Sequence, residues 1–173
     1  MTSPLPPFSV LRPFVAFLTT VLLAPVVLHG QDASLPVGSQ APRSVAVETL
    51  DGKPVELGHY IGKTPLVLEF WATWCPLCRE LEPRMRAAHA AHGGQVRFVV
   101  VAVSANETPE RVRAYAEKHQ ISWEILFDRK GTATAAFDVL ATSTIVVLDR
   151  TGRVVYAGQG SDQDIEGAIR KAL

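Results

Sequence analysis

The most informative part of the sequence is LVLEFWATWCPLC, which runs from Leu66 to Cys78. Its first six residues, Leu66 to Trp71, form an apolar run that suits a strand buried on both faces. Pro76 fits the first position of a helix, where its missing N–H carries no penalty. The stretch therefore predicts a buried strand that leads into a helix, with Cys75 and Cys78 at the start of that helix.

Cys75 and Cys78 are the only cysteines of the chain, which excludes a scaffold held by several disulfides. Side chains three residues apart lie on one side of the first helical turn, so the two sulfurs can form a disulfide with little backbone movement. At the N-cap, Cys75 faces free N–H groups and the positive end of the helix dipole, which favours the thiolate. Cys78 is then the more buried, resolving thiol that displaces a mixed disulfide formed at Cys75.

Glu69 is the single charged residue of the predicted strand. Burial of an ionised carboxylate is unfavourable and raises its pKa. Because Glu69 precedes Cys75 by six residues, we expect it beneath the helix start and near Cys78, as a proton acceptor for the resolving thiol. The alternative is an edge glutamate that points to solvent.

The rest of the chain alternates strands and helices. Strands that are linked through helices imply a parallel centre, and a closing hairpin implies an antiparallel edge, in one α/β domain with helices on both faces. Pro83 lies inside the first helix and is expected to kink it. The predicted strands cover residues 45–50, 54–57, 66–71, 96–103, 123–127, 144–149 and 154–157. The first predicted helix runs from residue 76 to the glycines 93 and 94, and the other helices cover 108–119, 132–137 and 162–173.

Composition and the N-terminal residues bear on location and partners. The chain has 173 residues, with 17 Lys and Arg against 17 Asp and Glu, which argues against a nucleic-acid binder. Residues 1–30 are predicted to be a signal peptide, because Arg12 precedes an uncharged run, 13–28, that is short for a membrane span. An uncleaved membrane anchor is the alternative. Residues 31–42 follow as a linker or entry segment and 43–173 as the domain.

The segment FWATWCPLC, residues 70–78, closely resembles the active-site stretch of thioredoxin-fold proteins. It is most similar to the exported TlpA/ResA-type thiol–disulfide oxidoreductases of the redoxin superfamily. The resemblance covers residues 35–173, with Pro83 at the helix-kinking proline and Glu69 at the buried acid. It implies a thioredoxin-like fold, with a mixed central sheet, helices on both faces and an N-terminal β-hairpin extension.

One position departs from the family pattern. The family has a cis-proline just before the late strand, facing the cysteine pair, and Ser143 occupies that position here. A cis bond before a residue other than proline costs about 2.5–4 kcal/mol, so the Thr142–Ser143 bond is either strained or trans. Family members use this loop to align substrate peptide, which this departure puts in doubt. We expect the Ser143 hydroxyl to contact Cys75, or the loop to keep its path with a trans bond and full activity.

We therefore predict an exported thiol–disulfide oxidoreductase that exchanges disulfides with protein substrates, as a reductase by resemblance. Cys75, Cys78 and Glu69 are the predicted catalytic residues. We expect no organic cofactor and no metal, the redox group being the Cys75–Cys78 disulfide. The predicted substrate-binding residues are Trp71, Trp74, Pro76, Thr142 and Ser143.

Location and partners follow from the export signal and the resemblance. We expect a monomer in the bacterial periplasm, or at the outer face of the cytoplasmic membrane, recycled by a membrane electron donor. The sequence leaves three substrate classes open: an apocytochrome, as in cytochrome c maturation, an oxidase copper-site protein, or client proteins in general. Two alternatives stay open: a copper- or metal-handling protein with Cys75 and Cys78 as thiolate ligands, and a redox-silent binding module of the same fold.

Overall fold

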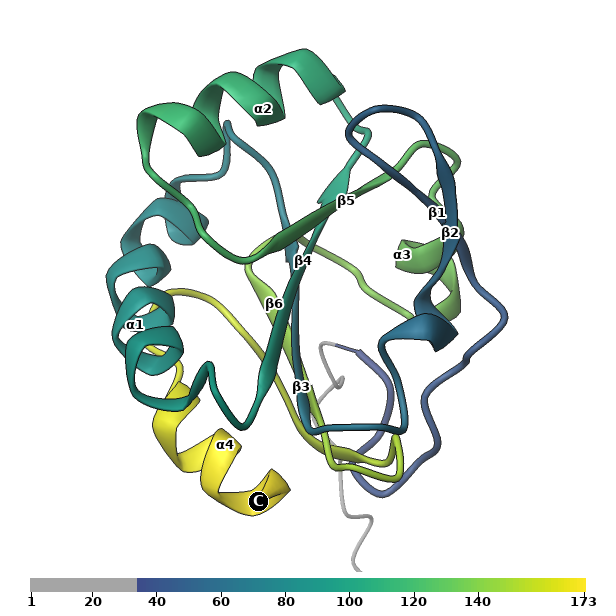
Figure 1. The fold of residues 1–173 in the computed structure, drawn as a ribbon, viewed down its shortest axis with the longest axis vertical. Helices are drawn as coiled ribbons and strands as arrows, with labels where there is room; N and C mark the ends of the chain where they lie inside the picture. The colour runs from purple at the N-terminus through teal and green to yellow at the C-terminus, as the bar shows by residue number, and fades with distance from the viewer. Residues whose placement is uncertain (1–33) are drawn as a thin grey trace, which may run out of the picture.

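The computed structural model describes residues 34–173 (Figure 1). The predicted signal peptide or anchor and the first residues of the predicted entry segment lie outside these residues. Seven strands form one sheet in the order β2-β1-β5-β4-β3-β6-β7. The elements are β1 (Ala46–Thr49), β2 (Pro54–Glu56), β3 (Leu66–Trp71), α1 (Pro76–His92), β4 (Arg97–Val103), α2 (Pro109–Lys118), β5 (Glu124–Asp128), α3 (Thr132–Ala136), β6 (Thr144–Leu148), β7 (Val154–Gln159) and α4 (Ile165–Ala172), with a short 3₁₀ turn at Leu57–His59.

The sheet is mixed, as the sequence predicts. Its centre is parallel, because β4 pairs in parallel with both β3 and β5. The β6–β7 hairpin adds two antiparallel strands beside β3. On the other side, β1 pairs antiparallel with β5 as well as with β2, so this hairpin continues the main sheet. The central position of β3 explains its continuous apolar sequence, since all six of its residues are buried.

Helices cover both faces of the sheet and define two cores. Helices α1, α2 and α4 lie on one face, and α3 lies on the other (Figure 1). Alternate residues of β3 feed the two cores: Val67 and Trp71 contact the α1 side, whereas Leu68 and Phe70 contact the α3 side. The strand that carries Glu69 is thus enclosed by protein on both faces, and its carboxyl end meets the start of α1.

Most boundaries lie within one residue of the prediction, and two that differ by more have physical reasons. The last helix begins at Ile165, three residues later than the sequence suggests, because Asp164 is its N-cap and accepts a hydrogen bond from the Gly167 N–H at 2.8 Å. Strand β7 extends to Gln159, because it stays paired with β6 back to Thr144. Pro83 lies inside α1, which continues to His92.

Candidate active site

The turn from β3 into α1 places the two cysteines as the sequence predicts. Cys75 is the N-cap of α1, with extended backbone, and its Sγ accepts a hydrogen bond from the Cys78 N–H at 3.1 Å. Pro76 occupies the first turn, where it leaves no donor unpaired. Cys75 and Cys78 form a disulfide with their Cα atoms 5.3 Å apart, within the usual range for such a bond. The helix N-terminus thus points at the sulfur of Cys75.

The disulfide lies under an apolar surface. Cys75 is 2% exposed and Cys78 is 1% exposed, so in the oxidised protein both are buried and the expected difference between them is small. Trp74 and Leu77, on either side of Cys75, are each 40% exposed, and Pro76 is exposed as well. The residues that flank Cys75 in the sequence are thus exposed, whereas Cys75 itself is buried.

Glu69 lies in the middle of β3 and is 3% exposed, which excludes the solvent-facing alternative. Burial, with a smaller contribution from the nearby Glu82 carboxylate, raises the pKa of Glu69 from 4.5 to about 8. Glu69 and Cys78 line the same small cavity. This arrangement places a titratable carboxyl beside Cys78.

Trp71, predicted to bind substrate at the surface around Cys75, is buried instead. It is 3% exposed and packs edge-to-face on Tyr115, with ring centroids 5.1 Å apart. Its side chain lines the cavity beside Glu69 and Cys78. The expectation that Trp71 contributes to a docking surface is therefore wrong, because β3 is covered on both faces up to its last residue. Trp74 is the tryptophan that reaches the surface.

Ser143 is held by internal hydrogen bonds. Its N–H donates to the Phe70 carbonyl at 2.9 Å, and its carbonyl accepts from the Gly160 N–H and from Gln163 Nε2, both at 3.0 Å. The hydroxyl donates to the Gly160 carbonyl at 3.0 Å, and not to Cys75 as expected. Residues 34–173 contain no cis peptide bond, so the Thr142–Ser143 bond is trans.

The backbone of Ser143 is in the left-handed region, with φ of 62°. Proline cannot adopt this angle, because its ring fixes φ near −65°. Proline would also remove the N–H that binds Phe70. The backbone at this position is therefore incompatible with proline, with Ser143 buried and Thr142 half-buried beside it.

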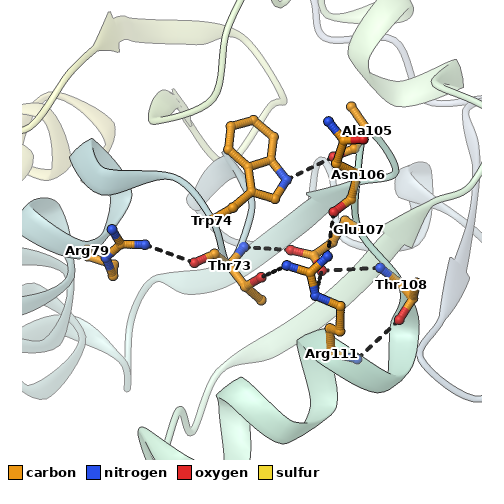
Figure 2. Close-up of polar contacts among 8 residues, drawn as sticks. All are labelled: Thr73, Trp74, Arg79, Ala105, Asn106, Glu107, Thr108 and Arg111. Atoms are coloured by element: carbon orange, nitrogen blue, oxygen red, sulfur yellow. Dashed lines mark hydrogen bonds and ion pairs between the residues drawn. The ribbon is translucent and has the colours of Figure 1, made fainter.

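Glu107 braces the approach to Cys75 and was not expected from the sequence. It is 6% exposed, and its carboxylate accepts hydrogen bonds from the Thr73 N–H at 2.7 Å and the Thr108 N–H at 3.2 Å. Arg111 lies on the other side of the carboxylate, 3.6 Å from it, and compensates its charge (Figure 2). The loop before α2 is thereby tied to the residues that precede the disulfide.

Two further bonds fix the same segment. The indole N–H of Trp74 donates to the Ala105 carbonyl at 2.8 Å, and Arg79 donates to the Thr73 carbonyl at 3.1 Å (Figure 2). Both main-chain groups of Thr73 thus have partners, one from α1 and one from the loop before α2. Trp74 is held in orientation although its face is exposed, so the surface around Cys75 is preorganised.

Within residues 34–173, no group of three or more His, Cys, Asp or Glu side chains is placed to hold a metal ion. No helix in the same residues is long and apolar enough to span a bilayer.

A thioredoxin-like α/β fold, with a redox-capable disulfide at the N-terminus of the helix that follows its central strand, defines the thiol–disulfide oxidoreductases. The family model described as Redoxin matches residues 36–173. The chain therefore belongs to the redoxin family, and within it to the TlpA/ResA-like thiol–disulfide oxidoreductases.

Individual relatives agree with this assignment. The chain is 31% identical over 139 residues to the thioredoxin-like protein YneN of Bacillus subtilis, covering 79% of this chain and 80% of YneN. It is 24% identical over 143 residues to the thiol–disulfide oxidoreductase ResA of Bacillus thuringiensis, covering 82% and 81%. A solved structure of a secreted Mycobacterium tuberculosis disulfide oxidoreductase matches with a TM-score of 0.63 and 26% identity, over 75% of this chain and 95% of that one.

Proposed function

We propose that this protein is an exported thiol–disulfide reductase that acts on protein disulfides through Cys75 and Cys78. The observation that carries the proposal is the position of Cys75 at the N-cap of α1, where its sulfur accepts the Cys78 N–H. That hydrogen bond and the helix dipole both stabilise negative charge on Cys75, which is the charge that an attacking thiolate carries.

In the proposed reaction the reduced protein starts with a thiolate on Cys75 and a thiol on Cys78. The Cys75 thiolate attacks one sulfur of the substrate disulfide, which forms a mixed disulfide and releases the other substrate sulfur as a thiolate. Glu69 then takes the proton of Cys78, and the resulting thiolate attacks Cys75. This step forms the Cys75–Cys78 disulfide and releases the second substrate sulfur, so two electrons have passed to the substrate.

The surface around Cys75 supports a protein as the substrate. Trp74, Pro76 and Leu77 form an exposed apolar surface around a disulfide that is itself buried. A flexible segment of a partner protein can cover this surface and bring its own sulfur to Cys75, and the burial of apolar area favours such a contact. Thr142 and Ser143 contribute through the shape of their loop, since the Ser143 main chain is already paired.

Export and recycling complete the proposal. The secreted relative and the signal-like residues 1–30 support a location outside the cytosol, in the periplasm or at the outer face of the membrane. A reductase in an oxidising compartment needs a continuous supply of electrons, for which we propose a donor in the membrane. Cytochrome c maturation is one pathway that requires a reductase of this kind.

The reduction potential of the Cys75–Cys78 couple tests the direction of electron flow. We expect a value near or below about −270 mV, as for reductases, and a value near about −120 mV would identify an oxidant instead. A Cys78→Ser variant should accumulate mixed disulfides at Cys75 with client proteins in cells, whereas a Cys75→Ser variant should not. Mass measurement of the exported chain, expected to begin at Gln31, tests cleavage of the leader.

A further inference from the structure

A second acidic residue faces the cavity that Glu69 and Cys78 share. Glu82, one helical turn after Cys78, lines this cavity from α1. The other lining residues are apolar or aromatic, apart from the indole N–H of Trp123, which has no hydrogen-bond partner among residues 34–173. The lining consists of Glu69, Trp71, Cys78, Glu82, Val100, Ile121, Trp123 and Ile125.

The carboxylate of Glu82 is held in place from two helices. One oxygen accepts two hydrogen bonds from Arg86, at 3.0 and 2.7 Å, and the other accepts the Tyr115 hydroxyl at 2.9 Å. The side chain is 13% exposed. Tyr115 remains a donor because burial, together with Glu82, raises its pKa to about 12. Glu82 is therefore a fixed negative charge near the inner side of the disulfide.

The charged and titratable groups around this cavity come from few elements. Helix α1 contributes Cys78, Glu82 and Arg86, and α2 contributes Tyr115. His119, which follows α2, lies with Nδ1 3.7 Å from Glu82 and stacks on Tyr115. The strands β4 and β5 contribute only Val100 and Ile125. Glu82, with Arg86 as its counter-charge, is thus the ionic group that faces Glu69.

Resting on the function proposed above, we propose that Glu82 is a positioning residue for the second half of the exchange. Burial is the larger reason that Glu69 keeps its proton, and the fixed carboxylate of Glu82 adds to it by repelling a negative charge on Glu69. Arg86, the counter-charge of Glu82, reduces this repulsion. Glu69 must be unprotonated to accept the proton of Cys78. Glu82 and Arg86 therefore set, in opposite directions, the pH range in which Cys78 displaces the substrate.

The two steps of the exchange can be separated with the reduced protein and a chromogenic aromatic disulfide as the probe. The attack by Cys75 releases one coloured thiolate at a rate that depends on probe concentration. The attack by Cys78 then releases the second coloured thiolate at a rate that is independent of probe concentration. The pH profile of this second phase reports the ionisation of the Glu69–Cys78 pair.

We expect Glu82→Gln to move the profile of the second phase to lower pH, because the amide keeps the size of the side chain but not its charge. With the pKa of Glu69 near 8, a displacement by one pH unit makes this phase about fivefold faster at pH ~7. Arg86→Gln should move the profile to higher pH and slow the phase. Glu80→Gln, on the same helix but exposed, is the matched control and should leave it unchanged.

Each outcome decides one of the two proposals. If neither coloured phase appears in the unmodified protein, the proposed function fails. If both phases appear but Glu82→Gln matches Glu80→Gln, only the role of Glu82 is overturned. A purely structural role predicts that Glu82→Gln and Arg86→Gln change the second phase in the same direction, and that result also overturns the inference, even where one variant is less stable.

Discussion

Replacing Glu69 by Gln tests the physical state of the buried carboxyl. The folded protein holds the proton of Glu69 up to a pKa of about 8, whereas the unfolded chain releases it near 4.5. Below pH ~4.5 the group is protonated in both states and contributes no difference. Between these two values the unfolded chain binds fewer protons than the folded protein, so the free energy of unfolding falls as the pH rises. Above pH ~8 Glu69 is ionised in both states, and the free energy of unfolding falls no further on its account.

The size of the effect follows from the two pKa values. A difference of one pKa unit corresponds to about 1.4 kcal/mol, so the loss is about 3 kcal/mol at pH ~7 and about 5 kcal/mol above pH ~8. Gln fills the same space without titrating. Relative to Glu69→Gln, the natural protein should therefore be most stable in acid and should lose that advantage steadily toward alkaline pH.

Urea unfolding of the two oxidised proteins, measured at intervals from about pH 4 to about pH 9, gives the difference in free energy directly. Working with the oxidised form keeps both cysteines from titrating. Glu80→Gln serves as the control, because Glu80 is exposed and should show no such trend. A difference between natural protein and Glu69→Gln that stays constant with pH would refute the reasoning, since it would mean that Glu69 ionises as in the unfolded chain.

Two other predictions concern the loops around the disulfide. Ser143→Pro should lower the free energy of unfolding in urea by about 2–4 kcal/mol, because proline removes the hydrogen bond to Phe70 and cannot adopt the positive φ. Ser143→Gly should change it by no more than about 1 kcal/mol, and equal losses in the two variants would contradict the loop geometry. Glu107→Ala should lower the free energy of unfolding by about 1–3 kcal/mol and speed hydrogen exchange at the Thr73 amide, which loses its acceptor. Glu117→Ala, at an exposed position, is the control. Unchanged exchange at Thr73 in Glu107→Ala would contradict the role of Glu107 in fixing this segment.

Features of the site that depend on neighbouring residues were predictable from the sequence. A helix that begins at Pro76 requires only local chemistry, and two cysteines three residues apart must then share its first turn. The burial of Glu69 also follows from the sequence, because five apolar residues accompany it in one strand. The same apolar strand ends at Trp71, so its burial also follows from the sequence, and this burial conflicts with its prediction as a substrate-binding residue.

The parts that could not be predicted depend on contacts between distant segments. Glu107 precedes the N-cap of α2 and resembles an ordinary polar loop residue until the fold brings Thr73, 34 residues earlier, onto its carboxylate. Glu82 has a helical spacing from Cys78 that places it on the same side of α1, and this was the one available signal. The positive φ of Ser143 had none, because serine seldom adopts that conformation.

The two cysteines of the disulfide lie in different electrostatic surroundings, which in the proposed reaction sets the order of the two attacks. The start of α1 presents N–H groups to Cys75, so negative charge is stabilised there. Cys78 shares a mostly apolar cavity with the Glu82 carboxylate, so negative charge is opposed there. A protein with this arrangement should attack with Cys75 first and release the substrate only after Glu69 has taken the Cys78 proton.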